Sequence, residues 1–170
     1  RCCKDKVAFA ENFHVIETYA NMMNPPVLVE PVGKGYVQIN PTWPPATQEE
    51  MDSFWDLPFT KLPHPRYKGK HIPAFEMIKF SINTHRGCFG GCNFCTIAAH
   101  QGKFIQSRSE ESIIKEIAGL NKLPGFAGNI SDVGAPTANM YGMRGKDPEL
   151  CAKCRRKSCL FPGPCRNMNR

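Results

Sequence analysis

The sequence predicts an α/β fold, in which a strand, a loop, a helix and a second strand follow one another in the middle of the chain. Residues 77–84 alternate apolar and polar side chains, as a half-buried strand does. Residues 107–120 begin with capping serines and continue with apolar side chains at helical spacing. Cysteines gather at 88–95 and at 151–165. We therefore divide the chain into a small α+β segment (1–74), a strand–helix–strand part (75–145) and a Cys-rich tail (146–170).

The composition is typical of a folded globular chain. With 170 residues, of which 41% are hydrophobic and 22% charged, the chain is long enough for one domain with a core, and general disorder is excluded. No run approaches the about 18 apolar residues of a membrane span, and no secretory signal is visible. We therefore expect no association with a membrane.

Much of the net charge of +7 lies near the C-terminus. A basic patch of this kind can bind nucleic acid. The same side chains can instead offset the negative charge of a thiolate-ligated metal, which is the interpretation that we favour. They are Lys153, Arg155, Arg156, Lys157, Arg166 and Arg170.

Residues 5–24 are expected to form the first helix, which Pro25 and Pro26 end. Apolar side chains recur along it at spacings of three and four, so they share one face, and we expect this face to be buried. The face consists of Phe9, Phe13, Ile16, Ala20 and Met23. Cys2 and Cys3 precede the helix and indicate no particular role.

Short strands at 27–29 and 36–39 are expected to pair, because Gly33-Lys34-Gly35 between them suits a hairpin turn. A capping-box pattern at residues 47–50 then predicts a short helix to about residue 55. Residues 57–73 contain four prolines, which predicts an extended connector.

The central strand, Met77–Thr84, leads directly into the first cysteine cluster. The helix after it is expected to begin at Ser107 or Ser109 and to stop before Pro124, and a second strand is expected at 129–133. A strand, a helix and a parallel strand would form one right-handed crossover. The predicted buried face of the helix is Ile113, Ile114, Ile117 and Leu120.

Three cysteines at a C-x3-C-x2-C spacing, Cys88, Cys92 and Cys95, predict a metal site with an open position. A cubane iron–sulfur cluster normally takes four thiolates, so three close ones leave one iron available. An open coordination position is typical of reactive rather than structural metal sites. Two other interpretations are a zinc site completed by His85 or His100, and reduced thiols buried in a core.

The octapeptide Cys88-Phe-Gly-Gly-Cys-Asn-Phe-Cys95 resembles the cluster motif of the radical S-adenosylmethionine (SAM) superfamily, including the aromatic Phe94 before the third cysteine. The flanking residues 81–87 and 96–103 resemble the YgiQ-like radical SAM proteins, whose function is uncharacterised. The resemblance runs from about Val27 to the C-terminus. It implies that residues 75–145 begin a partial (β/α) radical SAM barrel.

The resemblance also implies a chemistry. Cys88, Cys92 and Cys95 would bind three irons of a 4Fe-4S cluster, and SAM would chelate the fourth through its amine and carboxylate. An electron from a reductant such as flavodoxin or ferredoxin would cleave SAM to a 5′-deoxyadenosyl radical, which attacks a substrate that the sequence does not name. The protein positions and tunes these cofactors, and we assign no catalytic residue.

Three further residues are expected to contact SAM. Phe94 would flank the adenine, chiefly through its backbone. Gly134 and Ala135 stand where the superfamily often carries a Gly-Gly-Glu segment that binds the methionyl amine; only Gly134 matches, and no glutamate is present. Most strands of a complete barrel are missing, so we expect a fragment of a larger enzyme that is inactive alone.

The tail carries four cysteines as Cys151-x2-Cys154-x4-Cys159-x5-Cys165. Four ligands satisfy a metal without help, so we expect a closed site that holds a second 4Fe-4S cluster or zinc, with the cluster slightly favoured, and that is independent of the first site. Tight cysteine clusters in a chain of this length favour metal ligation in a reducing compartment. We therefore expect a cytoplasmic protein.

A different class of function is compatible with the same residues. The chain could be a zinc-binding protein that contacts nucleic acid through its basic Cys-rich tail. It could also be an inert interaction module. Iron-dependent colour would separate a cluster protein from both.

Overall fold

The computed structural model describes residues 4–135 and 138–169, so Cys2 and Cys3 lie outside the described residues. The chain forms two compact units, each built from separate stretches of sequence. The loop-and-tail unit comprises the described residues up to Pro45, Gly87–Ile105 and the described residues from Gly142 onward. The crossover unit comprises Ala46–Arg86 and Gln106–Tyr141. None of the described helices is long and apolar enough to cross a membrane.

Helix α1 (Lys6–Ala20) opens the loop-and-tail unit, and Asp5 caps it by accepting hydrogen bonds from two backbone N–H groups of the first turn. The helix ends earlier than residue 24, where the sequence predicted its end. The predicted burial of its apolar face is wrong. Phe9, Phe13 and Ile16 are 59%, 50% and 46% exposed, because few of the described side chains pack on this face.

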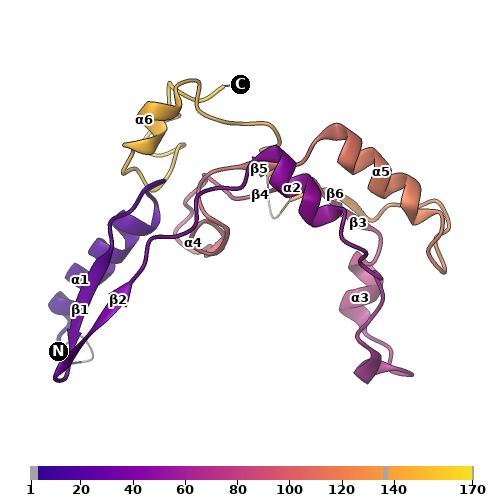
Figure 1. Cartoon of the computed structure of the whole chain (residues 1–170), viewed down its shortest axis with the longest axis horizontal. Coiled ribbons are helices and arrows are strands. Elements are labelled where there is room, and N and C mark those ends of the chain that lie inside the picture. Colours follow the sequence, from indigo (N-terminus) through magenta and orange to yellow (C-terminus); the bar gives the residue numbers. More distant parts are fainter. Residues whose placement is uncertain (1–3, 136–137, 170) are drawn as a thin grey trace. The chain divides into compact units, whose positions relative to one another are not determined.

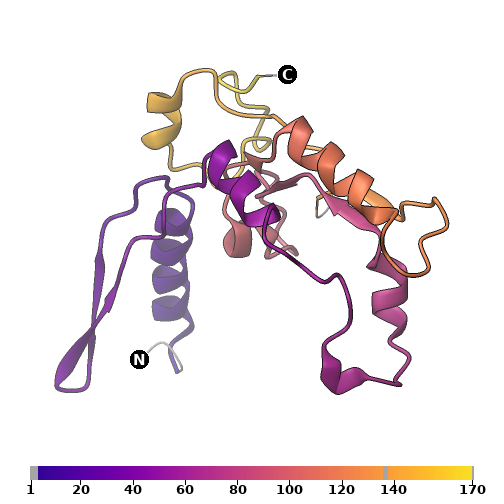
Figure 2. The ribbon, with the colours of Figure 1, turned by 45° about the vertical axis from the view of Figure 1, so that its right-hand side comes forward.

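The predicted hairpin is confirmed, and its strands are longer than expected. Strands β1 (Leu28–Val32) and β2 (Gly35–Ile39) pair antiparallel from Leu28–Ile39 to Val32–Gly35. Gly33 and Lys34 therefore form a two-residue turn, of the length that favours a tight hairpin. In both ribbon views the hairpin runs beside α1 (Figure 1, Figure 2).

The crossover unit contains the strand–helix–strand arrangement that the sequence predicts. Strands β3 (Ser81–Asn83) and β6 (Asp132–Gly134) pair in parallel, and helix α5 (Glu110–Leu120) separates them in the sequence. A second small sheet pairs β4 (His85–Arg86) antiparallel with β5 (Gln106–Ser107). The described residues form three two-stranded sheets and no closed barrel, so the fold is mixed α/β.

The N-terminal half of the predicted strand at 77–84 is helical instead. Helix α3 (Pro73–Ile78) starts with Pro73, whose fixed φ suits the first turn and whose missing N–H would have no partner there. The strand is therefore confined to β3, where Ile82 is 2% exposed, whereas Ile78 is 62% exposed. The predicted connector also contains a short 3-10 helix, η1 (Pro65–Tyr67).

Two predicted helix starts are confirmed. Helix α2 (Gln48–Trp55) has the capping box, in which the N–H of Glu50 donates to Thr47 Oγ1 at 3.2 Å and the N–H of Thr47 donates to Glu50 Oε2 at 2.9 Å. Helix α5 begins at Ser109, whose Oγ accepts from the next turn. The predicted burial of Ile114 on α5 is wrong, since this side chain is 63% exposed.

A buried arginine joins the elements of the crossover unit. Arg108 is 1% exposed, and its guanidinium donates to the Asn83 carbonyl at 2.7 Å and to the Ser112 carbonyl at 2.9 Å. It also pairs with Glu116 and lies over the Trp55 ring, 4.9 Å from the centroid. One side chain therefore contacts α2, β3 and α5 together.

We predict that Arg108→Met destabilises the chain by about 3 kcal/mol, because it breaks a buried ion pair and leaves its partners without their donor. Lys115→Met is the matched control, since Lys115 is 70% exposed and pairs with exposed Asp56, and such pairs contribute about 1 kcal/mol or less. Urea unfolding followed by circular dichroism measures both. Equal losses in the two variants would contradict the role given to Arg108.

Candidate metal centre

The cluster loop, residues 88–95, is fixed at both ends by backbone hydrogen bonds. At its start the N–H of Cys88 donates to the Gly102 carbonyl at 3.0 Å, and at its end the N–H of Cys95 donates to the Cys92 carbonyl at 3.0 Å. Helix α4 (Ile97–Gln101) follows directly. Phe89 is the buried side chain of the loop, at 6% exposed, so the loop rests on its own unit through this ring.

The three thiols of the cluster loop are free and accessible. Cys88 and Cys95 are half-buried, Cys92 is exposed, and none forms a disulfide. A Cβ added at Gly90 would lie 3.4 Å from Cys88 Sγ and 3.7 Å from Cys92 Sγ, so the space beside these thiols is open because residue 90 has no side chain. Three free thiols in one short loop, two of them beside the space at Gly90, fit the donor set of a cluster with one open iron.

The side chains of the seven clustered cysteines do not close around a common point. Within residues 4–135 and 138–169, no three His, Cys, Asp or Glu side chains converge closely enough to hold a metal ion. The assignment of these cysteines as ligands therefore stays a prediction. Of the two histidines considered as ligands, His100 is exposed, and His85 lies buried in the crossover unit with its Nδ1 2.9 Å from Thr84 Oγ1.

The tail folds into a compact turn that brings its cysteines near one another. Helix α6 (Pro148–Ala152) carries Cys151, and the N–H of Cys165 donates to the Cys159 carbonyl at 2.7 Å. Cys151, Cys159 and Cys165 line one cavity of about 50 Å³, together with Lys103 and Asn167. Sequence reasoning found the cysteines but not the last two residues, which no spacing pattern marks.

Burial is the largest influence on the pKa of the thiols that line this cavity. Burial raises the pKa of the Cys151 and Cys159 thiols, neighbouring thiols raise it further, and Lys103 lowers it. Lys103 is 3% exposed, and its Nζ lies 3.8 Å from Cys154 Sγ and 2.6 Å from the Arg156 carbonyl. A buried cation thus faces the tail thiols and opposes part of the rise in their pKa.

The tail and the cluster loop are in direct contact, although the sequence led us to expect independent sites. The N–H of Cys159 donates to the Phe89 carbonyl at 3.0 Å. The Ser158 hydroxyl donates to the Gly90 carbonyl at 2.7 Å. These bonds join residues far apart in sequence, which is why no local motif could indicate them.

The residues predicted to contact SAM lie in different surroundings. Phe94 is 92% exposed, so its ring packs against none of the described residues to any extent. Gly134 ends β6, and its carbonyl accepts from the Thr84 N–H at 2.8 Å. With Ala135 it lines a shallow pocket of about 200 Å³ beside β3. A polar ligand group could reach the backbone there.

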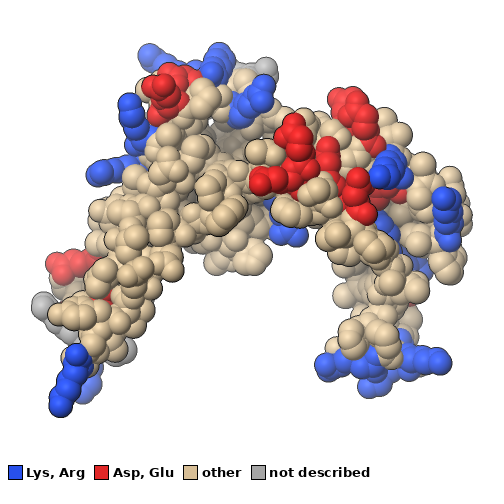
Figure 3. Space-filling model, viewed as in Figure 1, with Lys and Arg blue, Asp and Glu red and all other residues tan. Residues whose placement is uncertain are grey.

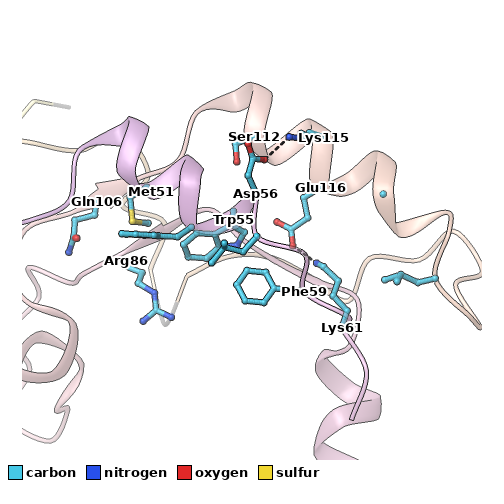
Figure 4. Close-up of a pocket in the computed structure, with 14 residues that line it drawn as sticks. Met51, Trp55, Asp56, Phe59, Lys61, Arg86, Gln106, Ser112, Lys115 and Glu116 are labelled. Atoms are coloured by element: carbon cyan, nitrogen blue, oxygen red, sulfur yellow. Dashed lines mark hydrogen bonds and ion pairs between the residues drawn. The ribbon is translucent and has the colours of Figure 1, made fainter. Parts of the chain in front are cut away.

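A larger pocket of about 810 Å³ in the crossover unit was not foreseen from the sequence. Figure 4 shows the side chains of Trp55 and Phe59 beside the Lys61–Glu116 ion pair, with Arg86 and the other lining residues around them. Most of its lining comes from α2, α5 and the connector between α2 and α3. Its lining residues come from stretches far apart in sequence, so no motif marks it.

The charges are distributed unevenly within each unit. Lys and Arg side chains gather around the tail, as the sequence indicates, whereas Asp and Glu side chains gather over α2 and α5 (Figure 3). In the loop-and-tail unit, Lys157 pairs with Glu17 at 2.9 Å and lies 5.6 Å from the centre of the Phe13 ring. Part of the basic charge of the tail therefore contacts α1 rather than solvent.

Comparison with known proteins identifies relatives along almost the whole chain. The family model described as Radical SAM N-terminal matches residues 1–81. A UPF0313 protein of Bacteroides thetaiotaomicron is 54% identical over 168 residues, and one of Porphyromonas gingivalis is 50% identical over 168 residues. The UPF0313 protein YgiQ of Escherichia coli is 49% identical over 166 residues.

These relatives are much longer than the present chain. The alignments cover 99%, 99% and 97% of this chain but 27%, 26% and 22% of the relatives, so the chain spans about a quarter of their length. The resemblance extends through the N-terminal helix, further than the start near Val27 that the sequence suggested. No solved structure matches the chain.

The buried His85 gives the chain a pH dependence that can be measured. Its side chain is 1% exposed, and burial lowers the pKa of its imidazole below the ordinary value of about 6.5. The unfolded chain therefore binds a proton more readily than the folded one. The buried, neutral imidazole therefore contributes to the free energy of unfolding above about pH 6.5. This contribution is lost as the pH falls through the lower pKa of the folded state.

We predict that urea unfolding at pH 7.5 and 5.5 shows a smaller loss of stability in His85→Gln than in the original chain. His100→Gln is the control, because His100 is exposed, and it should leave the pH dependence unchanged. An unchanged pH dependence in His85→Gln would show that other groups cause it.

Proposed function

Because this chain belongs to the YgiQ-like radical SAM proteins, we propose that it carries the cluster-binding part of a radical SAM enzyme. Cys88, Cys92 and Cys95 hold three irons of a 4Fe-4S cluster and leave the fourth iron for SAM. When bound, the cluster and SAM supply a reductive cleavage that starts radical chemistry on a substrate.

One observation carries this function: one short loop carries three free thiols, with space at Gly90 beside Cys88 and Cys92, in a chain 49–54% identical to UPF0313 proteins. The loop has defined backbone anchors at Cys88 and Cys95, so its ligands are presented from a fixed frame. Cys92 is exposed, which keeps one side of the site accessible to SAM and to a reductant.

The other residues of the chain bind and orient SAM. Gly90 leaves room for the cluster between two thiols. Phe94 meets the adenine when its exposed ring is covered. Gly134 and Ala135 offer backbone groups to the methionyl amine from the end of β6, in place of the glutamate that this chain lacks.

The proposed chemistry requires an electron donor and a compartment in which thiols stay reduced. The enzyme takes electrons from a carrier such as flavodoxin or ferredoxin and works in the cytoplasm, where thiols stay reduced. Residues 1–74, 75–145 and 146–170 act as an N-terminal segment, the start of the radical SAM core and a metal-binding tail. The tail carries a metal rather than nucleic acid, since its basic side chains offset thiolates.

Anaerobic reconstitution of the full-length protein with iron and sulfide tests the function. A brown protein that absorbs near about 400 nm, bleaches with dithionite and releases 5′-deoxyadenosine from SAM is expected. A colourless protein that holds only zinc would overturn the proposal and favour a zinc-binding nucleic-acid protein.

We predict that Cys88→Ala, Cys92→Ala and Cys95→Ala each abolish SAM cleavage in the full-length protein, because three thiolates are the minimum that holds a cubane with one open iron. Electron paramagnetic resonance of the reduced protein with and without SAM is the measurement. Cys2→Ala is the control and should keep the SAM-dependent signal. A single variant in the loop that retained the complete signal would contradict the ligand assignment.

We also predict that the present chain, expressed alone with its cluster rebuilt, binds SAM weakly or not at all. Binding pockets normally bury about 70–90% of a ligand, whereas Phe94 is 92% exposed and the chain spans about a quarter of its relatives. Isothermal titration with SAM measures the affinity, with the full-length protein as control. Micromolar binding to the short chain would show that it contains most of the site.

A further inference from the structure

Building on the function proposed above for the cluster loop, we propose that the tail holds a single thiolate-bound metal ion of the zinc class, which fixes the tail as a support behind that loop. The ligands are Cys151, Cys154, Cys159 and Cys165. The ion has a structural role, because four protein ligands leave it no open position. Its function is to hold the loop that carries Cys88, Cys92 and Cys95.

The tail supplies the ligand set of a structural zinc site. Such sites take four protein ligands, often with a C-x2-C pair, and Cys151 and Cys154 form such a pair. Cys151, Cys159 and Cys165 also line one cavity together with Lys103 and Asn167. A zinc ion needs only that the sulfurs close to about 2.3 Å around one point.

Two side-chain donors are aimed at the tail sulfurs, and one of them, Lys103, is buried. The ammonium of Lys103 lies 3.8 Å from Cys154 Sγ and also lines the cavity of the other three thiols. The Asn167 side-chain amide donates to Cys151 Sγ at 3.3 Å. Four thiolates around a divalent ion leave an excess of negative charge, and donors of this kind stabilise it and orient the ligands.

Lys103 also explains how Cys154 joins the site. Its ammonium donates to the Arg156 carbonyl at 2.6 Å as well as facing Cys154. Arg156 in turn donates to the carbonyls of Phe161 and Gly163, at 2.6 and 2.7 Å. These bonds shape the turn between Cys154 and Cys165.

The tail reaches the cluster loop through residues next to its ligands. Cys159 itself donates its N–H to the carbonyl of Phe89, the residue after Cys88. Ser158 donates its hydroxyl to the carbonyl of Gly90, between Cys88 and Cys92. An ion bound at Cys159 therefore fixes two carbonyls of the cluster loop.

Gly91 shows how close this contact is. Its φ of +61° is a left-handed conformation, and a Cβ there would lie 3.0 Å from the Lys157 carbonyl oxygen and 3.0 Å from Ser158 Cβ. A side chain at residue 91 would push the tail away. Because binding energies of linked sites are reciprocal, the tail ion favours cluster assembly and the assembled cluster favours retention of the tail ion.

Metal analysis of the full-length protein tests the identity of the tail metal. After anaerobic reconstitution in the presence of zinc, we expect about four irons and one zinc per chain. The variant in which Cys88, Cys92 and Cys95 are all alanine should lose the iron and keep the zinc. About eight irons without zinc, with about four surviving in that variant, would overturn the single-ion assignment and leave the proposed function intact.

Failure of the proposed function gives a different result. In that case the protein holds zinc but no iron, and it does not cleave SAM. The two failures are therefore distinguished by the iron content of the original protein.

The link between the sites is tested by Gly91→Ala. We expect this variant to lose zinc to a chelator about fivefold or more faster than the original protein and to take up less iron. Gly128→Ala is the matched control, because Gly128 has the same left-handed backbone, at φ +85°, with nothing within 4 Å of its Cβ.

A second measurement does not depend on folding of a variant. The zinc affinity of the original protein should be higher with the loop cluster assembled than without it. Equal zinc affinity in the two states, or equal behaviour of Gly91→Ala and Gly128→Ala, would overturn the support role of the tail.

Discussion

The buried guanidinium of Arg108 holds the crossover unit together, because few apolar side chains are available for this task. Among the described residues, the buried apolar side chains are Ala8, Met51, Ile82, Phe89, Leu120 and Met140. A core of this size contributes little hydrophobic free energy. Arg108 instead joins β3 and α5 by hydrogen bonds and contacts α2 through the Trp55 ring. A buried charge of this kind also specifies which elements can pack, since any other arrangement would leave it without partners.

The loop-and-tail unit follows the same rule with Lys103. This side chain is as deeply buried as Arg108, but it faces thiols and a carbonyl rather than a carboxylate. A buried ammonium without a carboxylate partner is costly, unless thiolates or a metal–thiolate group supply the negative charge. Ionised thiols in the tail would supply this charge, which supports the metal that we propose there.

Local signals in the sequence were sufficient for local structure. The capping box at Thr47, the cap at Ser109 and the Gly33-Lys34 turn each depend on residues close in sequence, and the structure contains all three. The alternation over 77–84 failed at Ile78 because Pro73 starts a helix upstream. Burial was predicted less well. Helices α1 and α5 are amphipathic as expected. Phe9 and Ile114 are nevertheless exposed and contact few of the described residues. The chain spans about a quarter of the length of its relatives.

In the candidate site, too, features that depend on neighbouring residues can be predicted and long-range contacts cannot. Candidate ligands can be proposed from spacing, because three cysteines within eight residues stay near one another along the chain, and their assignment as ligands stays a prediction. The contact between Cys159 and Phe89 cannot, because it joins residues 70 positions apart (159 − 89) through a backbone amide that every residue type except proline possesses. The consequence is chemical. Two carbonyls of the loop already accept hydrogen bonds from the tail, so in the proposed cluster site the tail would restrict how the backbone of the loop can turn. A tail that looks like a separate module in the sequence is thus in direct contact with the cluster loop.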